Sequence, residues 1–371
     1  MKSKVNVLVV DDSLFIRSFL SKILASDPSI GNIKTAVDGA AALSILSTYK
    51  PDIITLDVEM PRMNGLEALE VINKRYDIPV IMVSALTRKG ANITIKCLEL
   101  GAVDWIQKPD NRFDMNNYDS LKQELLQKIK LVVKIPVVTA IERSKIATNH
   151  VLRDVDNISS EQFREMVQNS GWAPKGRVDL DFKLIGIGIS TGGPSALNQI
   201  VPFLPKELNA AVIIVQHMPA TFTKVLAERL NDTSKINVKE AEDGDVIKRG
   251  WVYVVPGDKH IRLREVGTRE IRVVFDDYPK VGGFKPSAET LFYFVGEVAR
   301  AKSIGIIMTG MGSDGSDNLG RIKAYSGKTI AQDEESCIVF GMPKAAIKKG
   351  NADIVLPLNK IVAKINELVI Q

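Results

Sequence analysis

Three side chains with the chemistry of an acyl-transfer nucleophile stand among glycines and apolar runs. Ser190 lies at the centre of the sequence GISTG (188–192), directly after the apolar residues 184–187. His217 lies in QHMP (216–219), and Asp314 lies in MGSDG (311–315). An imidazole can take the proton of a serine hydroxyl, and a carboxylate can fix the imidazole tautomer and stabilise its charged form. These residues therefore predict a serine hydrolase.

Each of the three residues also has an ordinary explanation. The turn at Ser190 could bind an anion at a helix N-terminus, His217 could be a satisfied core histidine, and Asp314 could cap a helix. The order Ser, His, Asp differs from the Ser, Asp, His order of the usual esterase fold. Among the three histidines, His217 is favoured over His150 and the competing His260 because it directly follows a buried strand, the next one after the serine's own.

The glycines around Asp314 add a second feature to this site. Gly310, Gly312 and Gly315 permit close approach of the backbone and unusual φ values. Such a loop can turn amide N–H groups toward a developing oxyanion, although it could equally be an ordinary glycine-rich turn.

A second group of polar residues follows the predicted strands of the first third of the chain. Asp11 and Asp12 follow the apolar run 5–10, and Asp57 follows residues 53–56. The carboxyl ends of neighbouring parallel strands meet at one edge of a sheet. Three carboxylates there would repel one another without a hard cation, and Mg²⁺ prefers oxygen ligands. The ordinary alternative is that these acidic residues cap helices.

Two further residues belong to the same predicted edge. Ser84 follows residues 80–83, and Lys108 follows residues 103–106. A hydroxyl and an ammonium group can hold phosphoryl oxygens. The set therefore predicts a carboxylate that accepts a phosphoryl group.

The elements that must position these residues alternate between short apolar runs and amphipathic segments. In the first third this alternation predicts a doubly wound parallel sheet covered by helices. The expected strands are 5–10, 33–37, 53–56, 80–83 and 103–106, and the expected helices are 14–25, 40–47, 66–74, 91–100 and 121–133.

The pattern weakens between residues 135 and 181, where a linker with a short helix at 161–167 is expected. Alternation then resumes and predicts a second α/β domain. Its expected strands are 184–189, 211–216, 251–255 and 304–309, its helices are 225–230, 288–300 and 359–368, and a small antiparallel portion is expected from 252–255, 261–263 and 271–275. We therefore predict domains at 1–133 and 182–371, joined by a linker at 134–181.

The bulk composition is that of a globular protein. The chain has 371 residues, which suits two domains. Its net charge of +5 is a mild excess and is not a nucleic-acid signature. Two distant cysteines fit a reducing cytoplasm, and neither a signal peptide nor a membrane-spanning run is visible. A cytoplasmic location is expected.

The first group of residues resembles the receiver domain of two-component response regulators over about residues 4–133. The resemblance rests on VVDDS (9–13), Asp57, MP (60–61), Gly65, SA (84–85) and KP (108–109). It implies that Asp57 is the phosphoacceptor. It also implies that Asp11, Asp12, Asp57 and the carbonyl of Glu59 surround Mg²⁺, that Ser84 is the switch hydroxyl, that Lys108 binds phosphate, and that Trp105 is the switch aromatic, bulkier than the usual Tyr or Phe.

The second group resembles the bacterial chemotaxis protein-glutamate methylesterase/glutaminase family over about residues 184–358. The matching segments are 187–194, 216–219, 241–244, 256–260, 286–287, 309–315 and 337–343. The resemblance implies Ser190 as nucleophile, His217 as general base and Asp314 as its orienting acid. It further implies Met311 as an oxyanion donor through its backbone N–H, with Thr191 and His260 lining the site. The segment GGFK (282–285) and the linker depart from the family.

Together the two resemblances imply an enzyme of chemotactic adaptation that is activated by phosphorylation. It would hydrolyse glutamyl methyl esters on the cytoplasmic helices of chemoreceptors, release methanol and deamidate selected glutamines. A chemotaxis histidine kinase would donate the phosphoryl group, and Mg²⁺ would serve only the receiver. The alternatives are a response regulator whose output domain binds DNA and a non-catalytic adaptor that binds receptors.

Overall fold

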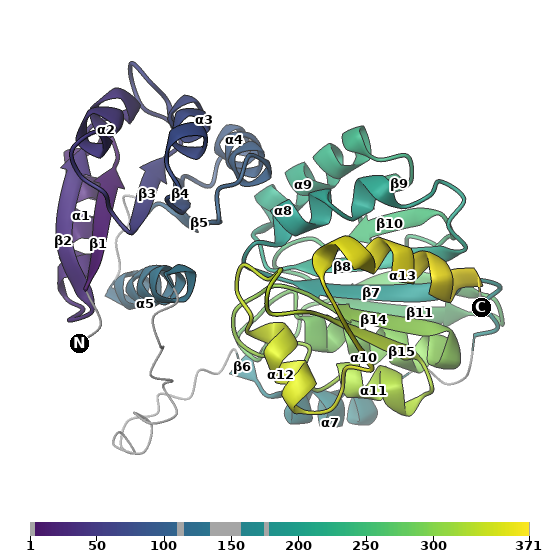
Figure 1. The fold of residues 1–371 in the computed structure, drawn as a ribbon. Helices are drawn as coiled ribbons and strands as arrows, with labels where there is room; N and C mark the ends of the chain where they lie inside the picture. The colour runs from purple at the N-terminus through teal and green to yellow at the C-terminus, as the bar shows by residue number, and fades with distance from the viewer. Residues whose placement is uncertain (1–3, 110–114, 134–156, 174–177, 371) are drawn as a thin grey trace, which may run out of the picture. The chain divides into compact units, whose positions relative to one another are not determined.

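The computed structural model describes residues 4–109, 115–133, 157–173 and 178–370. The chain divides into two compact units, Met1–His150 and Val151–Gln371, and each has its own sheet and core (Figure 1). Among the described helices, none combines the length and the apolar character that crossing a bilayer requires.

The first unit is a five-stranded parallel sheet in the order β2-β1-β3-β4-β5, and it confirms the predicted doubly wound fold. Every residue of the strands β3 and β4 is buried, because helices cover both faces of the sheet. The chain runs from β1 to β2 on one side and then to β3 on the other, so the sheet has a topological switch point between β1 and β3. The elements are β1 (Val5–Val10), α1 (Leu14–Ala25), β2 (Ile30–Ala36), α2 (Gly39–Leu46), β3 (Ile53–Asp57), α3 (Gly65–Arg75), β4 (Val80–Ser84), α4 (Arg88–Glu99), β5 (Asp104–Gln107) and α5 (Met115–Val132).

The second unit contains a seven-stranded parallel sheet in the order β16-β15-β14-β7-β8-β10-β9. From the central strand β7 the chain moves first to β8 and later returns to β14, so a second switch point lies between β7 and β14. The strands are β7 (Lys183–Ile189), β8 (Ala210–Gln216), β9 (Asn237–Glu240), β10 (Trp251–Val254), β14 (Ser303–Ile307), β15 (Lys328–Gln332) and β16 (Ile354–Leu356). The helices are α7 (Ser160–Ser170), α8 (Gly193–Asn198), α9 (Ala220–Thr233), α10 (Ala288–Ala299), α11 (Leu319–Ala324), α12 (Met342–Lys348) and α13 (Leu358–Ile370), with short 3-10 turns at Val201–Phe203 and Arg300–Lys302.

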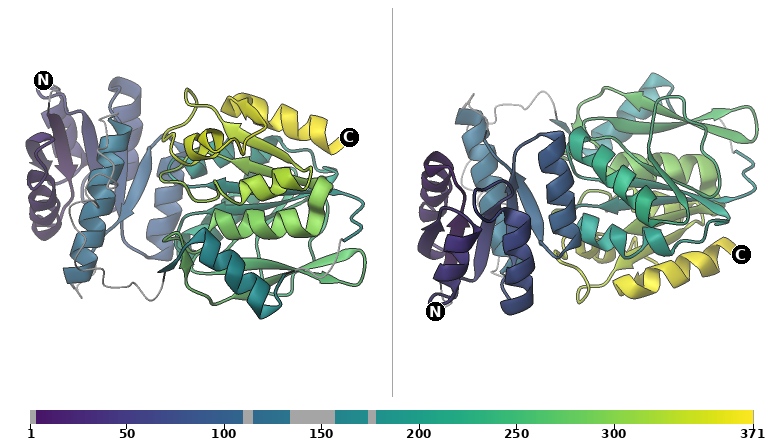
Figure 2. Two further views of the ribbon diagram at one scale, coloured as in Figure 1. Left: turned by 90° about the horizontal axis from the view of Figure 1, so that it is seen from below. Right: turned by 90° about the horizontal axis from the view of Figure 1, so that it is seen from above.

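Helix α10 lies at the centre of this unit and is buried along its whole length. It contacts β7 and β14 on one side and β11 (His260–Val266) on the other. Gly188 permits this close packing, because a Cβ atom at that position would lie 2.7 Å from the Cβ of Ala288. Figure 2 shows α13, in yellow, on the face of the sheet opposite to α10.

The predicted antiparallel portion is only partly right. β11 pairs antiparallel with β12 (Glu270–Asp276), but β10 belongs to the parallel sheet, where it lies between β8 and β9. The residues 252–254 are buried on both faces, which is typical of a parallel strand covered on each side.

The predicted linker at 134–181 also needs correction. Residues 157–173 and 178–181 belong to the second unit, and Phe163 and Val167 of α7 are fully buried in its core. These two residues are four positions apart and therefore share one face of the helix. Phe163 packs edge-on against Tyr293 at 5.4 Å between ring centroids. The remainder of the predicted linker, with His150, lies outside the described residues.

Candidate active site

Ser190 and His217 follow adjacent parallel strands at the same level. Strands β7 and β8 are in register, with Ile189 opposite Gln216, so the next residues along the chain are neighbours. The amide of His217 donates to the carbonyl of Ile189 at 3.2 Å. On the other side, the amide of Ser190 donates to the carbonyl of Thr309, directly after β14, at 3.0 Å. Ser190 is therefore held at the switch point where ligands bind in such sheets.

The turn after Ser190 requires glycine at two positions. Gly192 has φ +78°, and a Cβ atom at Gly193 would lie 1.8 Å from the side-chain oxygen of Gln216. The carbonyl of Ser190 accepts hydrogen bonds from the Gly193 amide at 2.8 Å and from Gln216 Nε2 at 2.9 Å. Since these contacts fix the backbone on both sides of Ser190, its partly exposed hydroxyl is presented on a rigid turn.

The glycine-rich loop after β14 packs directly against the serine. A Cβ atom at Gly310 would lie 2.8 Å from the Cβ of Ser190. The hydroxyl of Thr309 donates to the carbonyl of Thr191 at 2.9 Å, which fastens the loop to the serine turn. Met311 follows in this loop, and its amide makes no hydrogen bond with another residue in the described part of the chain. The side chain of Thr191 is buried beside these groups.

His217 is held by Asp314 and leaves one ring nitrogen free. Its Nε2 lies 2.8 Å from Asp314 Oδ2, and its side chain is only 8% exposed. Its Nδ1 is buried and has no hydrogen-bond partner among the residues that the structure describes. A carboxylate at Nε2 favours the proton there and a lone pair on Nδ1. The Ser190 hydroxyl does not yet donate to that nitrogen, and catalytic hydrogen bonds of this kind often tighten only with substrate bound.

Asp314 is positioned by the N-terminus of α10. Its carboxylate accepts from the hydroxyl of Ser287 at 2.5 Å, from the amide of Ala288 at 2.6 Å and from the amide of Glu289 at 3.3 Å, besides its contact with His217. The positive end of the helix dipole favours a negative charge here. Asp314 is not the N-cap of the helix that follows it, because α11 begins at Leu319 and its N-cap is Asn318.

Ser287 and Glu289 are functional candidates that the sequence did not single out. Ser287 is fully buried, and a serine just before an apolar helix is a recognisable N-cap signal. The carboxylate of Glu289 accepts from the amides of Asp317 and Asn318 at 2.9 and 2.7 Å, which ties the loop after Asp314 to α10. Burial, followed by the charge of Asp314, raises the pKa of Glu289 to about 8.

His260 is enclosed rather than available as a base. It is fully buried, its Nε2 lies 3.0 Å from the carbonyl of Pro279, and its ring stacks on Tyr278 at 4.3 Å. Burial lowers the pKa of His260 to about 4, so its ring is neutral near pH 7. Its geometry therefore makes it a weaker candidate for the general base than His217.

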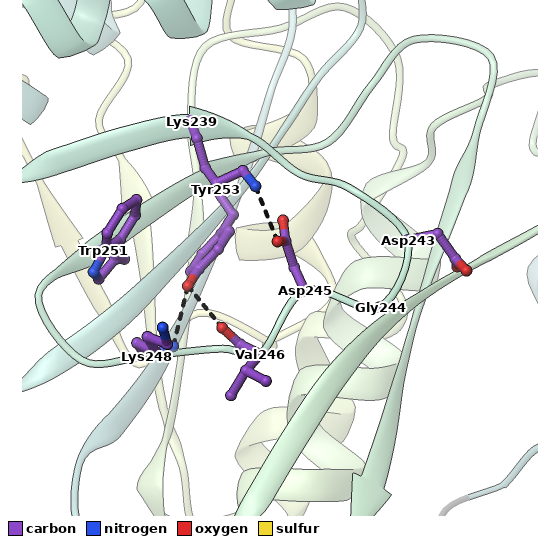
Figure 3. A pocket seen from close by; sticks show the side chains of 8 residues that line it. All are labelled: Lys239, Asp243, Gly244, Asp245, Val246, Lys248, Trp251 and Tyr253. Atoms are coloured by element: carbon purple, nitrogen blue, oxygen red, sulfur yellow. Dashed lines mark hydrogen bonds and ion pairs between the residues drawn. The ribbon is translucent and has the colours of Figure 1, made fainter.

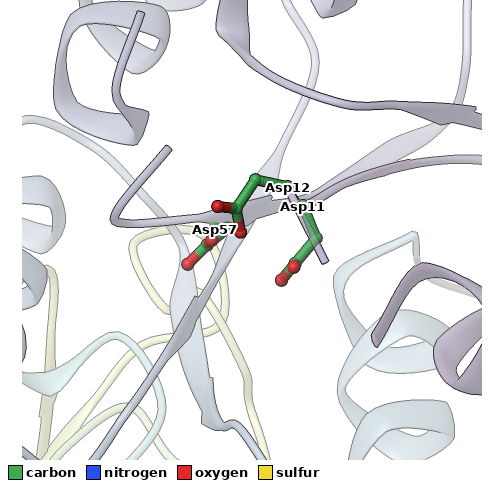
Figure 4. A group of neighbouring side chains, drawn as sticks. All are labelled: Asp11, Asp12 and Asp57. Atoms are coloured by element: carbon green, nitrogen blue, oxygen red, sulfur yellow. The ribbon is translucent and has the colours of Figure 1, made fainter. Parts of the chain in front are cut away.

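The three carboxylates of the first unit do converge, as Figure 4 shows. Ligand oxygens of Asp11, Asp12 and Asp57 all lie within 4.8 Å of one another, with Asp11 and Asp57 buried and Asp12 exposed. Lys108 Nζ lies 2.9 Å from Asp11 and 2.7 Å from Asp57. Burial and then the charge of Asp11 raise the pKa of Asp57 to about 6. Such a crowded set of oxygens suits a hard divalent cation, and helix capping does not explain it because Ser13 is the N-cap of α1.

The other predicted receiver residues surround this cluster. Ser84 ends β4 and is buried, and its carbonyl accepts from the amide of Lys108 at 2.8 Å. The amide of Glu59 donates to Asp57 at 3.3 Å, while the Glu59 carboxylate pairs with Lys89 at the surface. Trp105 is 8% exposed, and Lys128 Nζ donates to its carbonyl at 2.5 Å.

A shallow pocket of about 400 Å³ lies beside strands β9 and β10 (Figure 3). Its polar groups bond to one another. Lys239 pairs with Asp245 at 2.9 Å, and the Tyr253 hydroxyl donates to the carbonyl of Val246 and accepts from the amide of Lys248. These contacts fasten the turn between the two strands. The pocket contains none of the predicted catalytic residues.

Comparison with known proteins identifies the same two parts. Residues 185–365 match the CheB methylesterase family, and residues 7–118 match the response regulator receiver domain. The protein-glutamate methylesterase/protein-glutamine glutaminase of Pyrococcus horikoshii is 43% identical over 97% of this chain and 92% of its own length. The corresponding proteins of Thermotoga maritima and Bacillus subtilis are 40% and 41% identical, each over 98% of both chains.

A solved structure agrees with these relatives. The crystal structure of the Thermotoga maritima CheB methylesterase catalytic domain is 45% identical to this chain, with a TM-score of 0.50, and the match covers 51% of this chain and 99% of that one. A methylesterase match over the second unit leaves no support for the alternative of a DNA-binding output domain. The chain belongs to the family of protein-glutamate methylesterases/protein-glutamine glutaminases that carry a response regulator receiver domain.

Proposed function

We propose that this protein hydrolyses γ-glutamyl methyl esters on the cytoplasmic helices of chemoreceptors and deamidates selected receptor glutamines. Ser190 is the nucleophile, His217 the general base and Asp314 the residue that orients the base. The observation that carries this proposal is the arrangement at His217. Its Nε2 faces Asp314 at 2.8 Å, and its buried Nδ1 has no partner in the described part of the chain. A base oriented on one nitrogen and free on the other is what serine activation needs.

The reaction follows the usual course of acyl transfer. His217 Nδ1 takes the hydroxyl proton as Ser190 Oγ attacks the ester carbonyl, and the amide of Met311 donates to the oxyanion. The tetrahedral intermediate collapses, and methanol leaves with the proton that His217 returns. Water, activated by the same imidazole, then hydrolyses the acyl-enzyme to the free glutamate. With a glutamine substrate, ammonia leaves in place of methanol.

Phosphorylation of Asp57 activates the enzyme in this proposal. Bound Mg²⁺, held by Asp11, Asp12, Asp57 and the carbonyl of Glu59, would neutralise charge on the phosphoryl group. Lys108 already contacts two of these carboxylates and can bind phosphoryl oxygens, and the buried hydroxyl of Ser84 can donate to them. A chemotaxis histidine kinase supplies the phosphoryl group.

Methanol release from methylated receptor membranes tests both parts, with and without a small-molecule phosphodonor and Mg²⁺. Wild type should release methanol and respond to the phosphodonor. Ser190→Ala should release none, and Asp57→Ala should keep basal release and lose only the response. Ser195→Ala, a serine three residues beyond the turn in α8, is the matched control and should behave as wild type.

Full activity in Ser190→Ala would contradict the serine mechanism. Release from no variant, wild type included, would favour the non-catalytic adaptor that binds receptors.

The unphosphorylated receiver restricts access to Ser190 in this proposal, and phosphorylation shifts the equilibrium toward an accessible site. A fragment that carries residues 157–371 tests this point. It must begin ahead of α7, since Phe163 and Val167 are part of the core of the second unit. The fragment should exceed the unphosphorylated full chain in activity, and equal activity would contradict the restriction.

A further inference from the structure

The segment 277–285, called here the active-site strap, contains the sequence GGFK (282–285). Within it, β13 (Lys280–Val281) pairs with β6 (Asn157–Ile158). The amide of Gly282 donates to the carbonyl of Ile158 at 2.9 Å, and the amide of Gly283 donates to Asn157 Oδ1 at 2.8 Å. Both glycines have positive φ, +61° and +89°, which explains why glycine suits this turn.

The base of the strap is closed and fastened to the domain. Lys285 Nζ bonds Asp277 Oδ1 at 2.5 Å and the carbonyl of Tyr278 at 3.2 Å. The ring of His260 contacts the carbonyl of Pro279 at 3.0 Å. The strap is therefore fixed at its base through His260 and at its tip through Asn157.

Phe284 connects the strap to His217, the proposed general base. Its ring stacks on His217 with 4.0 Å between centroids and 9° between planes. Its amide donates to the carbonyl of Val281 and its carbonyl accepts from the amide of Val281, so the backbone at Phe284 is fixed within the strap. The contact with Asp314 holds His217 at one atom, Nε2, whereas a flat ring against its face also fixes the plane of the imidazole.

We propose that Phe284 is a positioning residue for His217, and that Asn157 sets the position of Phe284 through Gly283. The inference rests on the proposed function in one respect, which is that His217 acts as the base. Asn157 lies in the stretch that the sequence predicts as linker. A residue of that stretch therefore contributes to the geometry of the catalytic site.

The kinetic test uses the full chain with methylated receptor membranes and the phosphodonor. Phe284→Leu keeps an apolar side chain but removes the stacked ring, and should lower kcat about tenfold with KM within about twofold, since small misplacements of a catalytic group are costly. Phe284→Tyr should restore kcat. Asn157→Ala should lower kcat, and Asn157→Asp, which keeps an acceptor oxygen, should restore most of it. Phe203→Leu, at an aromatic residue that is 68% exposed, is the control.

A second measurement does not depend on the receptor substrate. The chain has three histidines, so a full-length sample with ¹³C in the histidine rings gives few signals. The ring current of Phe284 should shift the His217 ring protons upfield, and Phe284→Leu and, in part, Asn157→Ala should remove that shift. The same samples report the rate at which a fluorophosphonate labels Ser190, which depends on activation of the serine by its base.

The outcomes separate the inference from the proposed function. An unchanged His217 resonance in Phe284→Leu would overturn the stacking, and a changed resonance with unchanged kcat and labelling rate would overturn the positioning role. If wild type releases no methanol but Phe284→Leu slows labelling and Phe284→Tyr restores it, the inference stands and the proposed substrate falls.

Discussion

Each unit has a functional carboxylate near the switch point of its parallel sheet, but the groups that surround the two carboxylates differ. Asp57 ends β3 at the switch point of the first sheet, and its neighbours are two more carboxylates and one lysine. Asp314 lies near the switch point of the second sheet, and its neighbours are a hydroxyl, two amides and an imidazole. A parallel sheet with a switch point thus holds a cluster of carboxylates in one unit and, in the other, a single carboxylate surrounded by hydrogen-bond donors.

This difference indicates what each site can do. Burial and then repulsion from Asp11 raise the pKa of Asp57 to about 6, so the cluster favours a bound cation that offsets its negative charge. The carboxylate of Asp314 already accepts four hydrogen bonds from its own chain, which suits a residue that must stay in one orientation. Four experiments test this difference between the two sites.

Removing the acceptor character of Asp314 should have the largest effect. In Asp314→Asn the amide group cannot accept from every donor that now faces the carboxylate, and His217 loses the partner that fixes its tautomer. We expect methanol release to fall about 10⁴-fold, as for loss of the orienting acid in other serine hydrolases. Asp317→Asn is the matched control, since that carboxylate pairs with Lys349 at the surface. A loss below about tenfold would show that Asp314 is not needed to orient the base.

Chelation of divalent cations should affect the carboxylate cluster of the first unit and leave the serine site of the second unit unchanged. EDTA should abolish the stimulation by a phosphodonor, because Asp11, Asp12 and Asp57 need a cation to bind a further anionic group. Basal methanol release should be unchanged, since the proposed ester hydrolysis uses only Ser190, His217 and Asp314. Parallel measurement of both rates, with restoration by added Mg²⁺, checks the result. A fall in basal release would contradict the proposed independence of the serine site.

Ser287→Ala should have a smaller effect on the same carboxylate. The mutation removes the 2.5 Å hydrogen bond to Asp314 and the side-chain cap of α10. Asp314 then loses one of the donors that orient it, and kcat should fall about tenfold, since small misplacements of a catalytic group are costly. The lost cap should lower the free energy of unfolding by about 1 kcal/mol. Ser287→Thr should restore both kcat and the free energy of unfolding. A loss of stability without a change in kcat would mean that Ser287 serves only as the N-cap of α10.

The sequence predicts residues that lie at strand ends better than residues that act through packing. The positions of Asp57, Ser190 and His217 follow from apolar runs that end just before them. Phe284 carries no such signal, because its contact with His217 depends on how a distant strand pairs with residues 280–281. The same limit explains the linker, where only the spacing of Phe163 and Val167 hints at burial.

The antiparallel assignment of β10 failed for a related reason. Its apolar run predicts a buried strand but not which strands will flank it, and in the structure those are the parallel strands β8 and β9. Ser287 and Glu289 were missed because their partner Asp314 is 25 or more residues away in the chain. The pattern of apolar residues along the chain thus locates the helices and strands and the functional residues at strand ends. The residues that support those functional residues depend on contacts between distant segments.

The smallest expected effect concerns the contribution of His260 to the stability of the second unit. The unfolded chain protonates this histidine below about pH 6.5, whereas burial keeps the folded form neutral until about pH 4. More protons are bound by the unfolded state in that window, so the free energy of unfolding falls as the pH is lowered from 6.5 to 4. In His260→Gln this dependence should be flatter, by about 1 kcal/mol per pH unit.

Denaturant unfolding followed through Trp172 and Trp251, in a Trp105→Phe background, reports on the second unit. His260→Gln should be less stable than the parent above pH 6.5, where it loses the stack on Tyr278, and the gap should narrow as the pH falls. All other titrating groups are common to both proteins and cancel in the comparison. Parallel curves across the window would mean that His260 is not held neutral by the fold.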